Sequence, residues 1–292
     1  MNKTSIKEKS KISVIIATIG GSVLERTVSL LNNSSVFPDE IIVVIPKEYQ
    51  ANIPVKLFPN LRYEIVPFKG QVAQRAHGFK IAKYNFVLQL DDDIYLEPNC
   101  VENLLSGLNY LGPGHSVGPS IFFKEDGLTI YPSRKGVFNS FFNSDHNKMG
   151  TISKIGSAYG YDYDMTNNET NSTEWLAGGC VLHYKSGLIL DDFFPFEGKA
   201  YGEDLIHSVH LSKNGILLCN IKSAICYIDK PVLDNMNYSL RHDFRSRCYL
   251  NKIRGESILF VYIWFFIRTI INFTSTITNT FLNRIKSIIK YK

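Results

Sequence analysis

In Phe86-Val-Leu-Gln-Leu-Asp-Asp-Asp93, a mostly apolar run leads directly into three consecutive carboxylates. Such a run is typical of a strand covered on both faces, as in the parallel sheet of an α/β protein. Ligands of these sheets collect at the carboxyl ends of the strands. We therefore expect a binding site at Asp91, Asp92 and Asp93. The alternative is a solvated turn before a helix that begins after Pro98.

The acidic triplet predicts a cation. Three adjacent carboxylates repel one another, so the cluster is unfavourable in a cleft unless a cation or a cationic ligand lies among them. Oxygen ligands suit a hard divalent ion such as Mn²⁺ or Mg²⁺, which takes one or two carboxylates and completes its coordination with substrate phosphates.

Composition narrows the class of protein. A chain of 292 residues that is 45% hydrophobic can bury a large core in one or two domains. Its five cysteines are odd in number and show no Cys-x-x-Cys spacing, which favours a reducing compartment over a disulfide framework or a zinc knuckle. The net charge of +5 is too small and dispersed to indicate nucleic acid. Residues 1–10 read as a flexible arm without a signal peptide.

The first part of the chain alternates between strand and helix patterns. Strands are expected at 12–18, 40–45, 62–66 and 86–90, and helices at 23–32 and 70–83. Strands separated by helices pair in parallel through right-handed crossovers. Residues 11–110 therefore predict a nucleotide-binding type of α/β half.

The second part, residues 111–250, has a different texture. Residues 124–172 are rich in Asn, Ser, Gly and Tyr, and we expect loops and short strands over the site. Order resumes in a strand pattern at 174–183, where the pair Gly178-Gly179 indicates a close approach to the backbone. Glu203 and Asp204 then begin a helix.

Together these motifs resemble the family 2 glycosyltransferases of GT-A fold. The resemblance covers about residues 11–250 and rests on Ser13-Val-Ile-Ile-Ala-Thr18, Gln74-Arg-Ala-His-Gly78, Leu90-Asp-Asp-Asp93 and Gly202-Glu-Asp-Leu205. It implies an α/β fold with a Rossmann-like, mostly parallel central sheet flanked by helices. The expected organisation is this domain followed by a helical C-terminal tail, residues 251–292.

The resemblance also implies roles for individual residues. Asp91 and Asp93 match the Asp-x-Asp that holds Mn²⁺ or Mg²⁺ on the donor diphosphate, and His242 matches a third metal ligand of some relatives. Asp204, preceded by Glu203, matches the general base. The residues that match donor-binding positions of the family are Thr18, Arg75, Asp91, Asp92 and Arg247.

These residues predict an inverting glycosyltransferase that moves a sugar from a nucleotide-sugar donor to a hydroxyl acceptor, in surface polysaccharide or glycan biosynthesis. One base opposite a metal-bound leaving group gives a single displacement with inversion. One alternative is a haloacid dehalogenase-like phosphatase that uses Asp91 and Asp93, with Asp91 as nucleophile. Another is a non-catalytic, membrane-bound scaffold. The sequence does not specify the donor sugar, the nucleotide base, the acceptor or the linkage.

The tail is expected to lie on a membrane surface. Residues 258–267 are apolar, but the run is too short to span a bilayer, which takes about 20 residues. Farther on, apolar residues recur at helical spacing and basic residues cover the other face, as in an interfacial helix. The alternative is that the first segment packs back on the domain. The predicted location is the cytoplasmic, inner face of the cell membrane, where a lipid-linked glycan is a suitable acceptor.

Overall fold

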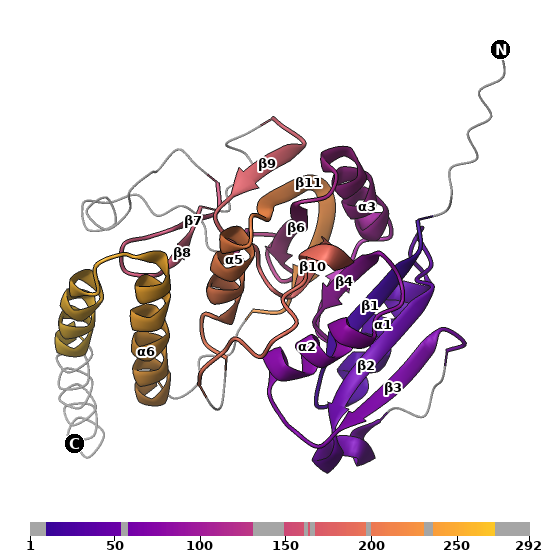
Figure 1. Cartoon of the computed structure of the whole chain (residues 1–292), viewed down its shortest axis with the longest axis horizontal. Coiled ribbons are helices and arrows are strands. Elements are labelled where there is room, and N and C mark those ends of the chain that lie inside the picture. The colour runs from indigo at the N-terminus through magenta and orange to yellow at the C-terminus, as the bar shows by residue number, and fades with distance from the viewer. Residues whose placement is uncertain are drawn as a thin grey trace, which may run out of the picture.

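The computed structural model describes residues 10–53, 58–130, 149–160, 163, 167–196, 200–230 and 236–271. Among these residues, nine strands form one sheet in the order β3-β2-β1-β4-β10-β6-β11-β5, with β9 paired to β11 (Figure 1). The strands of this sheet are β1 (Ile12–Ala17), β2 (Glu40–Pro46), β3 (Leu61–Val66), β4 (Phe86–Leu90), β5 (Tyr95–Leu96), β6 (His115–Phe123), β9 (Thr170–Thr173), β10 (Cys180–Tyr184) and β11 (Leu217–Ile228). A separate pair joins β7 (Thr151–Ile152) to β8 (Ala158–Tyr159).

The sheet confirms the α/β fold expected from the sequence. Strands β3, β2, β1 and β4 are parallel neighbours, and β11 is parallel to β6. Every residue of β1 and β2 is buried, which explains why their sequences are apolar rather than alternating. Strand β10 lies antiparallel between β4 and β6. One sheet therefore contains strands from both 11–110 and 111–250.

Helices cover both faces of the sheet. On one face, α1 and α3 pack on apolar side chains of β1, β4 and β10, and on the other face α2 packs against β1 and β2. Helix α5 lies on the same face as α2, where its Leu211 belongs to the same apolar cluster as Val181 of β10. The helices are α1 (Ser22–Asn32), α2 (Gln71–Ile81), α3 (Cys100–Leu111), α5 (Glu203–Lys213) and α6 (Met236–Arg254).

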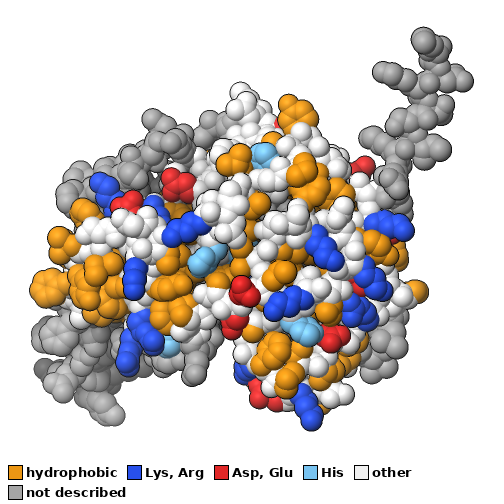
Figure 2. All heavy atoms as spheres, viewed as in Figure 1, with side chains coloured by type: hydrophobic (Ala, Val, Ile, Leu, Met, Phe, Trp, Pro, Cys, Tyr) orange, Lys and Arg blue, Asp and Glu red, His pale blue; other side chains and the backbone are white. Residues whose placement is uncertain are grey.

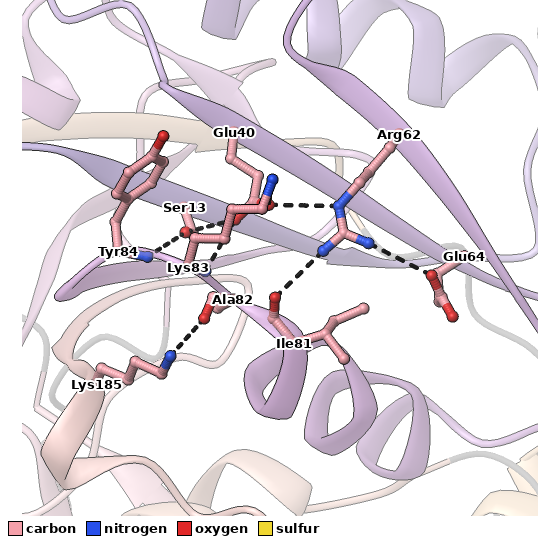
Figure 3. Close-up of polar contacts among 9 residues, drawn as sticks. All are labelled: Ser13, Glu40, Arg62, Glu64, Ile81, Ala82, Lys83, Tyr84 and Lys185. Atoms are coloured by element: carbon pink, nitrogen blue, oxygen red, sulfur yellow. Dashed lines mark hydrogen bonds and ion pairs between the residues drawn. The ribbon is translucent and has the colours of Figure 1, made fainter.

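A buried carboxylate ties together the starts of β1, β2 and β3. Glu40 is 5% exposed and accepts hydrogen bonds from Ser13 Oγ at 2.8 Å, Arg62 Nε at 3.3 Å and the Lys83 backbone N–H at 3.1 Å (Figure 3). Arg62 also donates to the carbonyl of Ile81 at the end of α2. A buried charge needs such partners. This network lies at the amino ends of the strands, whereas the acidic triplet follows the carboxyl end of β4, at the opposite end of the sheet.

The strand expected at 174–183 begins only at Cys180. Residues 174–179 lie outside the strand, with a turn at Gly178 and Gly179, and the carbonyl of Gly179 accepts the N–H of Asp91 at 2.8 Å. The two glycines therefore lie just outside the strand, beside the end of β4.

The C-terminal part packs at the side of the molecule away from β3 (Figure 1). After α6 the chain turns at Gly255, and residues 259–271 are helical. Phe244 of α6 contacts the rings of Tyr262 and Phe265, and Val261 is fully buried. Within the part of the chain that the structure describes, no helix is both long and apolar enough to cross a membrane. The remainder of the expected tail, 272–292, lies outside the described residues.

Candidate active site

The three carboxylates after β4 have three different environments. Asp91 Oδ1 accepts hydrogen bonds from Gln71 Nε2 at 3.1 Å and from the guanidinium of Arg75 at 2.5 Å. Asp92 accepts a hydrogen bond from the hydroxyl of Thr18. Asp93 is exposed. Repulsion within the triplet is thus reduced by one cation and one hydroxyl donor, while Asp93 stays open to solvent.

Thr18 links the ends of two neighbouring strands. Its side chain is almost buried, and its hydroxyl accepts the N–H of Gly20 at 2.8 Å while donating to Asp92. Because β1 and β4 are parallel neighbours, Thr18 and Asp92 leave the sheet at the same edge. The structure therefore brings these two predicted donor-binding residues into contact.

The second acidic centre lies at the start of α5. Glu203 is 4% exposed and forms an ion pair of 2.5 Å with Arg75, which is itself 3% exposed. Asp204 lies against the turn before β10, because a Cβ built on Gly178 would be 2.5 Å from Asp204 Oδ1. A Cβ on Gly179 would be 3.4 Å from Asp91 Oδ2. The close approach indicated by the glycine pair is thus made by carboxylates from both acidic centres.

Burial governs the protonation of these groups. It raises the pKa of Asp204 well above the usual range for a carboxyl, and the charge of Glu203 raises that pKa further, while Arg75 opposes both. Desolvation also raises the pKa of Asp91, and the charge of Arg75 offsets part of this effect. A carboxyl with a raised pKa is suited to accept a proton from a hydroxyl.

Arg75 binds two carboxylates. Its two terminal nitrogens contact Asp91 and Glu203, and its expected role in donor binding stays a prediction. Asp91 follows β4 and Glu203 begins α5, so the guanidinium of Arg75 on α2 bridges two other elements. Arg75 therefore lies in the wall of the site.

Arg247 and His242 lie on α6. Arg247 donates to Asp243 Oδ1 at 2.8 Å, to the Ile155 carbonyl at 2.9 Å and to the hydroxyl of Ser157. None of these contacts is with the acidic triplet, so the structure does not join Arg247 to the predicted donor site. The donor-binding role of Arg247 stays a prediction.

His242 stacks on Tyr201, just before α5, with 6.2 Å between ring centroids. Among the described residues, no group of three His, Cys, Asp or Glu side chains is arranged to hold a metal ion. The role of His242 as a metal ligand stays a prediction. Asp91 and Asp93 fit a site of one or two carboxylates that is completed by phosphate oxygens and water.

Three glutamines complete the site and were missed from the sequence. Gln71 donates to Asp91, and Gln74 Nε2 donates to the carbonyls of Thr18 and Val44. Gln89 Nε2 donates to the carbonyl of Gly178 at 2.5 Å. A signal existed for Gln71, because it lies four residues before Arg75 and thus on the same helix face.

Comparison with known proteins agrees with this geometry. The chain matches the family model described as "Glycosyl transferase family 2" over residues 13–166. It is 27% identical over 157 residues to "Uncharacterized glycosyltransferase YwdF" of Bacillus subtilis, a match that covers 51% of this chain and 58% of that protein. Among solved structures it resembles the crystal structure of GalNAc-T7 with UDP, GalNAc and Mn²⁺, with a TM-score of 0.58 and 14% identity. That likeness covers 82% of this chain and 50% of the other.

The fold and the acidic site define the GT-A class of glycosyltransferase structures. Within that class, the chain belongs to glycosyl transferase family 2. This assignment decides against the haloacid dehalogenase-like interpretation of Asp91 and Asp93. The chain spans about half the length of the relatives it matches, 58% of one and 50% of the other.

Proposed function

We propose that this protein transfers a glycosyl group from a nucleotide-sugar donor to a hydroxyl acceptor with inversion at the anomeric carbon. The observation that carries the proposal is the convergence of Asp91 and Asp204 on the turn at Gly178 and Gly179. A carboxylate that binds the leaving-group side and a carboxylate that accepts a proton are thereby held at one site. A single displacement needs both.

The residues divide the chemistry between them. Asp204 accepts the acceptor hydroxyl proton as that oxygen attacks, a contribution of roughly 10²–10⁴ in rate. Asp91 and Asp93 are the candidate ligands of Mn²⁺ or Mg²⁺, which when bound neutralises the charge that develops on the diphosphate. Thr18 orients Asp92 at the rim of the site. The Mn²⁺ in the GalNAc-T7 structure supports a divalent cation here.

The donor and the stereochemistry are tested together. Thermal-shift measurements with UDP-, GDP-, dTDP- and CMP-sugars, each with and without Mn²⁺, identify the nucleotide, because a ligand stabilises by RT ln(1 + [L]/Kd). NMR of the product then gives the anomeric configuration. Retention of configuration overturns the single displacement, and the absence of any metal-dependent shift across the panel favours the scaffold alternative.

We also propose that the protein acts at the inner face of the cell membrane, on a lipid-linked acceptor in glycan or surface polysaccharide biosynthesis. Large apolar side chains are exposed on the last described helix, 259–271, and at the residue just before it: Ile258, Leu259, Tyr262, Ile263, Phe266, Ile270 and Ile271. Figure 2 shows apolar side chains gathered where Figure 1 places this helix and α6. An apolar stripe of this kind suits the interface of a bilayer.

Charge favours anionic lipid as the surface that this helix contacts. After Glu256 the sequence contains no acidic residue and five basic residues: Arg268, Arg284, Lys286, Lys290 and Lys292. The +5 net charge of the chain therefore equals the charge of this segment. Each basic residue near an anionic surface contributes about 1 kcal/mol. All five cysteines are free, which suits the cytoplasmic side.

A further inference from the structure

One buried arginine contacts both acidic centres of the site. One terminal nitrogen of Arg75 lies 2.5 Å from Asp91 Oδ1, and the other lies 2.5 Å from Glu203 Oε1. Asp91 follows β4, Arg75 belongs to α2 and Glu203 begins α5, so a single side chain joins three elements. The exposed fractions of Arg75 and Glu203, 3% and 4%, leave little water to screen these contacts.

Two buried histidines near Arg75 carry no charge. His183 of β10 and His207 of α5 are buried, and their ring centroids are 5.8 Å apart. Burial, and to a smaller extent the charge of Arg75, lowers the pKa of His183 to about 3. Desolvation lowers the pKa of His207 well below its usual range. Both imidazoles are therefore neutral at pH 7. Arg75 thus supplies the positive charge between Asp91 and the Glu203–Asp204 pair.

We infer that Arg75 is a positioning residue that couples the cation-binding carboxylate Asp91 to the base-bearing start of α5. In this inference Glu203 contacts neither the donor nor the acceptor. It acts through Arg75 by fixing the position at which α5 presents Asp204. The inference rests on the proposed function for the roles of Asp91 and Asp204. It gives Glu203 a task distinct from proton transfer.

The chemistry of guanidinium explains why the residue is arginine. Its planar fork presents two terminal nitrogens in fixed directions, so it binds two carboxylates from different elements at once. The ammonium of lysine is a single point charge on a flexible stem and cannot hold both in the same geometry. Arg75→Lys keeps the charge and removes the fork, which separates positioning from electrostatics.

The first test needs no metal and no substrate. Unfolding of the full chain in EDTA is measured for Arg75→Met, Glu203→Gln and the double variant. A direct ion pair predicts that the double variant is less destabilised than the two single effects together, because its second change removes a carboxylate already without a partner. The control is Glu40→Gln, which breaks a buried network at the other end of the sheet and is expected to add independently to Arg75→Met. Additive effects for Arg75 and Glu203 overturn the bridge.

The second test measures coupling to the cation site with Mn²⁺ itself, by electron paramagnetic resonance of the free ion. Glu203→Gln is expected to weaken Mn²⁺ binding by up to roughly 10-fold, the lower end of the effect of losing a direct partner of a metal ligand, because Glu203 acts on Asp91 through Arg75. In the Arg75→Met background the same substitution is expected to have little effect, since the link to Asp91 is gone. Equal effects in both backgrounds overturn the inference. A wild-type chain that binds no Mn²⁺ overturns the proposed cation site, and the unfolding cycle still decides whether the bridge exists.

The third measurement separates positioning from substrate binding. Arg75→Lys is expected to lower kcat by about 10- to 100-fold while the KM for the nucleotide sugar changes little. If instead KM rises with kcat unchanged, Arg75 binds the donor directly and the positioning role is wrong.

Discussion

Gly178 stands where a side chain would collide with Asp204. A Cβ at this position would lie 2.5 Å from Asp204 Oδ1 and 3.2 Å from Gln89 Nε2. Gln89 also donates to the Gly178 carbonyl, so the turn is held from the side of β4 as well. The position of the candidate base Asp204 therefore requires a residue without a Cβ at position 178, in the turn before β10.

Gly178→Ala is expected to reduce kcat at least 10-fold by displacing Asp204, with a smaller effect on donor affinity. Steady-state kinetics and a donor thermal shift measure the two effects. The matched control is Gly187→Ala, whose Cβ would meet the flexible end of Ile216 at 3.0 Å. Comparable activity in Gly178→Ala and wild type contradicts the placement of the base.

Asp93→Asn is expected to abolish metal-dependent transfer with little change in unfolding free energy, because Asp93 is exposed and the volume is nearly unchanged. Asp91→Asn is expected to abolish transfer and also to destabilise the fold by about 1–3 kcal/mol, since Arg75 loses a charged partner. Chemical denaturation with turnover assays distinguishes the two variants. Normal metal-dependent turnover in Asp93→Asn removes Asp93 from the cation site.

Asp204→Asn is expected to lose roughly 10²–10⁴ in kcat while it keeps its affinity for the nucleotide sugar, because a base contributes mainly in the transition state. Glu203→Gln is expected to lose less activity but more stability, because it removes one of the carboxylates bound to Arg75. A larger activity loss at Glu203 than at Asp204 moves the base by one residue.

The buried histidines predict a loss of stability in acid. An unfolded chain takes up protons on histidine near pH 6.5, whereas the folded pKa of His183 is about 3 and that of His207 is also lowered. The contribution of these histidines to the unfolding free energy therefore falls as pH drops below 6.5, by up to about 1.4 kcal/mol per pH unit for each histidine. His183→Gln and His207→Gln are expected to reduce this slope, and His115→Gln is the control. The carboxyls with raised pKa values, Asp91, Asp93 and Asp204, contribute a slope of opposite sign that is common to all these proteins. An unchanged slope in both variants contradicts the assignment.

The full chain is expected to co-sediment with anionic vesicles at low salt and to be released as salt rises, because screening weakens surface attraction. Phe266→Glu with Ile270→Glu, two exposed positions, is expected to reduce binding, as is truncation after Asn251. Leu128→Glu, equally exposed elsewhere, is the control. Wild-type protein that stays in the supernatant at low salt contradicts the membrane proposal. Dimerisation that requires Phe266 assigns the stripe to a second copy instead.

Short-range sequence patterns are enough to locate the local elements and the two acidic centres along the chain. Strands such as β1 and β2 are buried throughout, so their continuous apolar runs predict them without any knowledge of neighbours. Asp91 follows its strand directly and Glu203 begins its helix, so both positions depend on adjacent residues. The pair Gly178-Gly179 likewise indicated a close approach before the approaching groups were known.

Which side chains contact one another depends on tertiary packing. Arg75 and Glu203 are separated by 128 positions, and their contact depends on α2 and α5 packing on the same face of one sheet. Apolar periodicity predicts which face of a helix is buried. It does not predict which element packs on that face or which cationic side chain pairs with a buried carboxylate. For the same reason, the partners of Arg247 in the turn before β8 could not be read from its place in the sequence. Contacts of this kind depend on the packing of whole elements, so the residues adjacent in the sequence do not predict them.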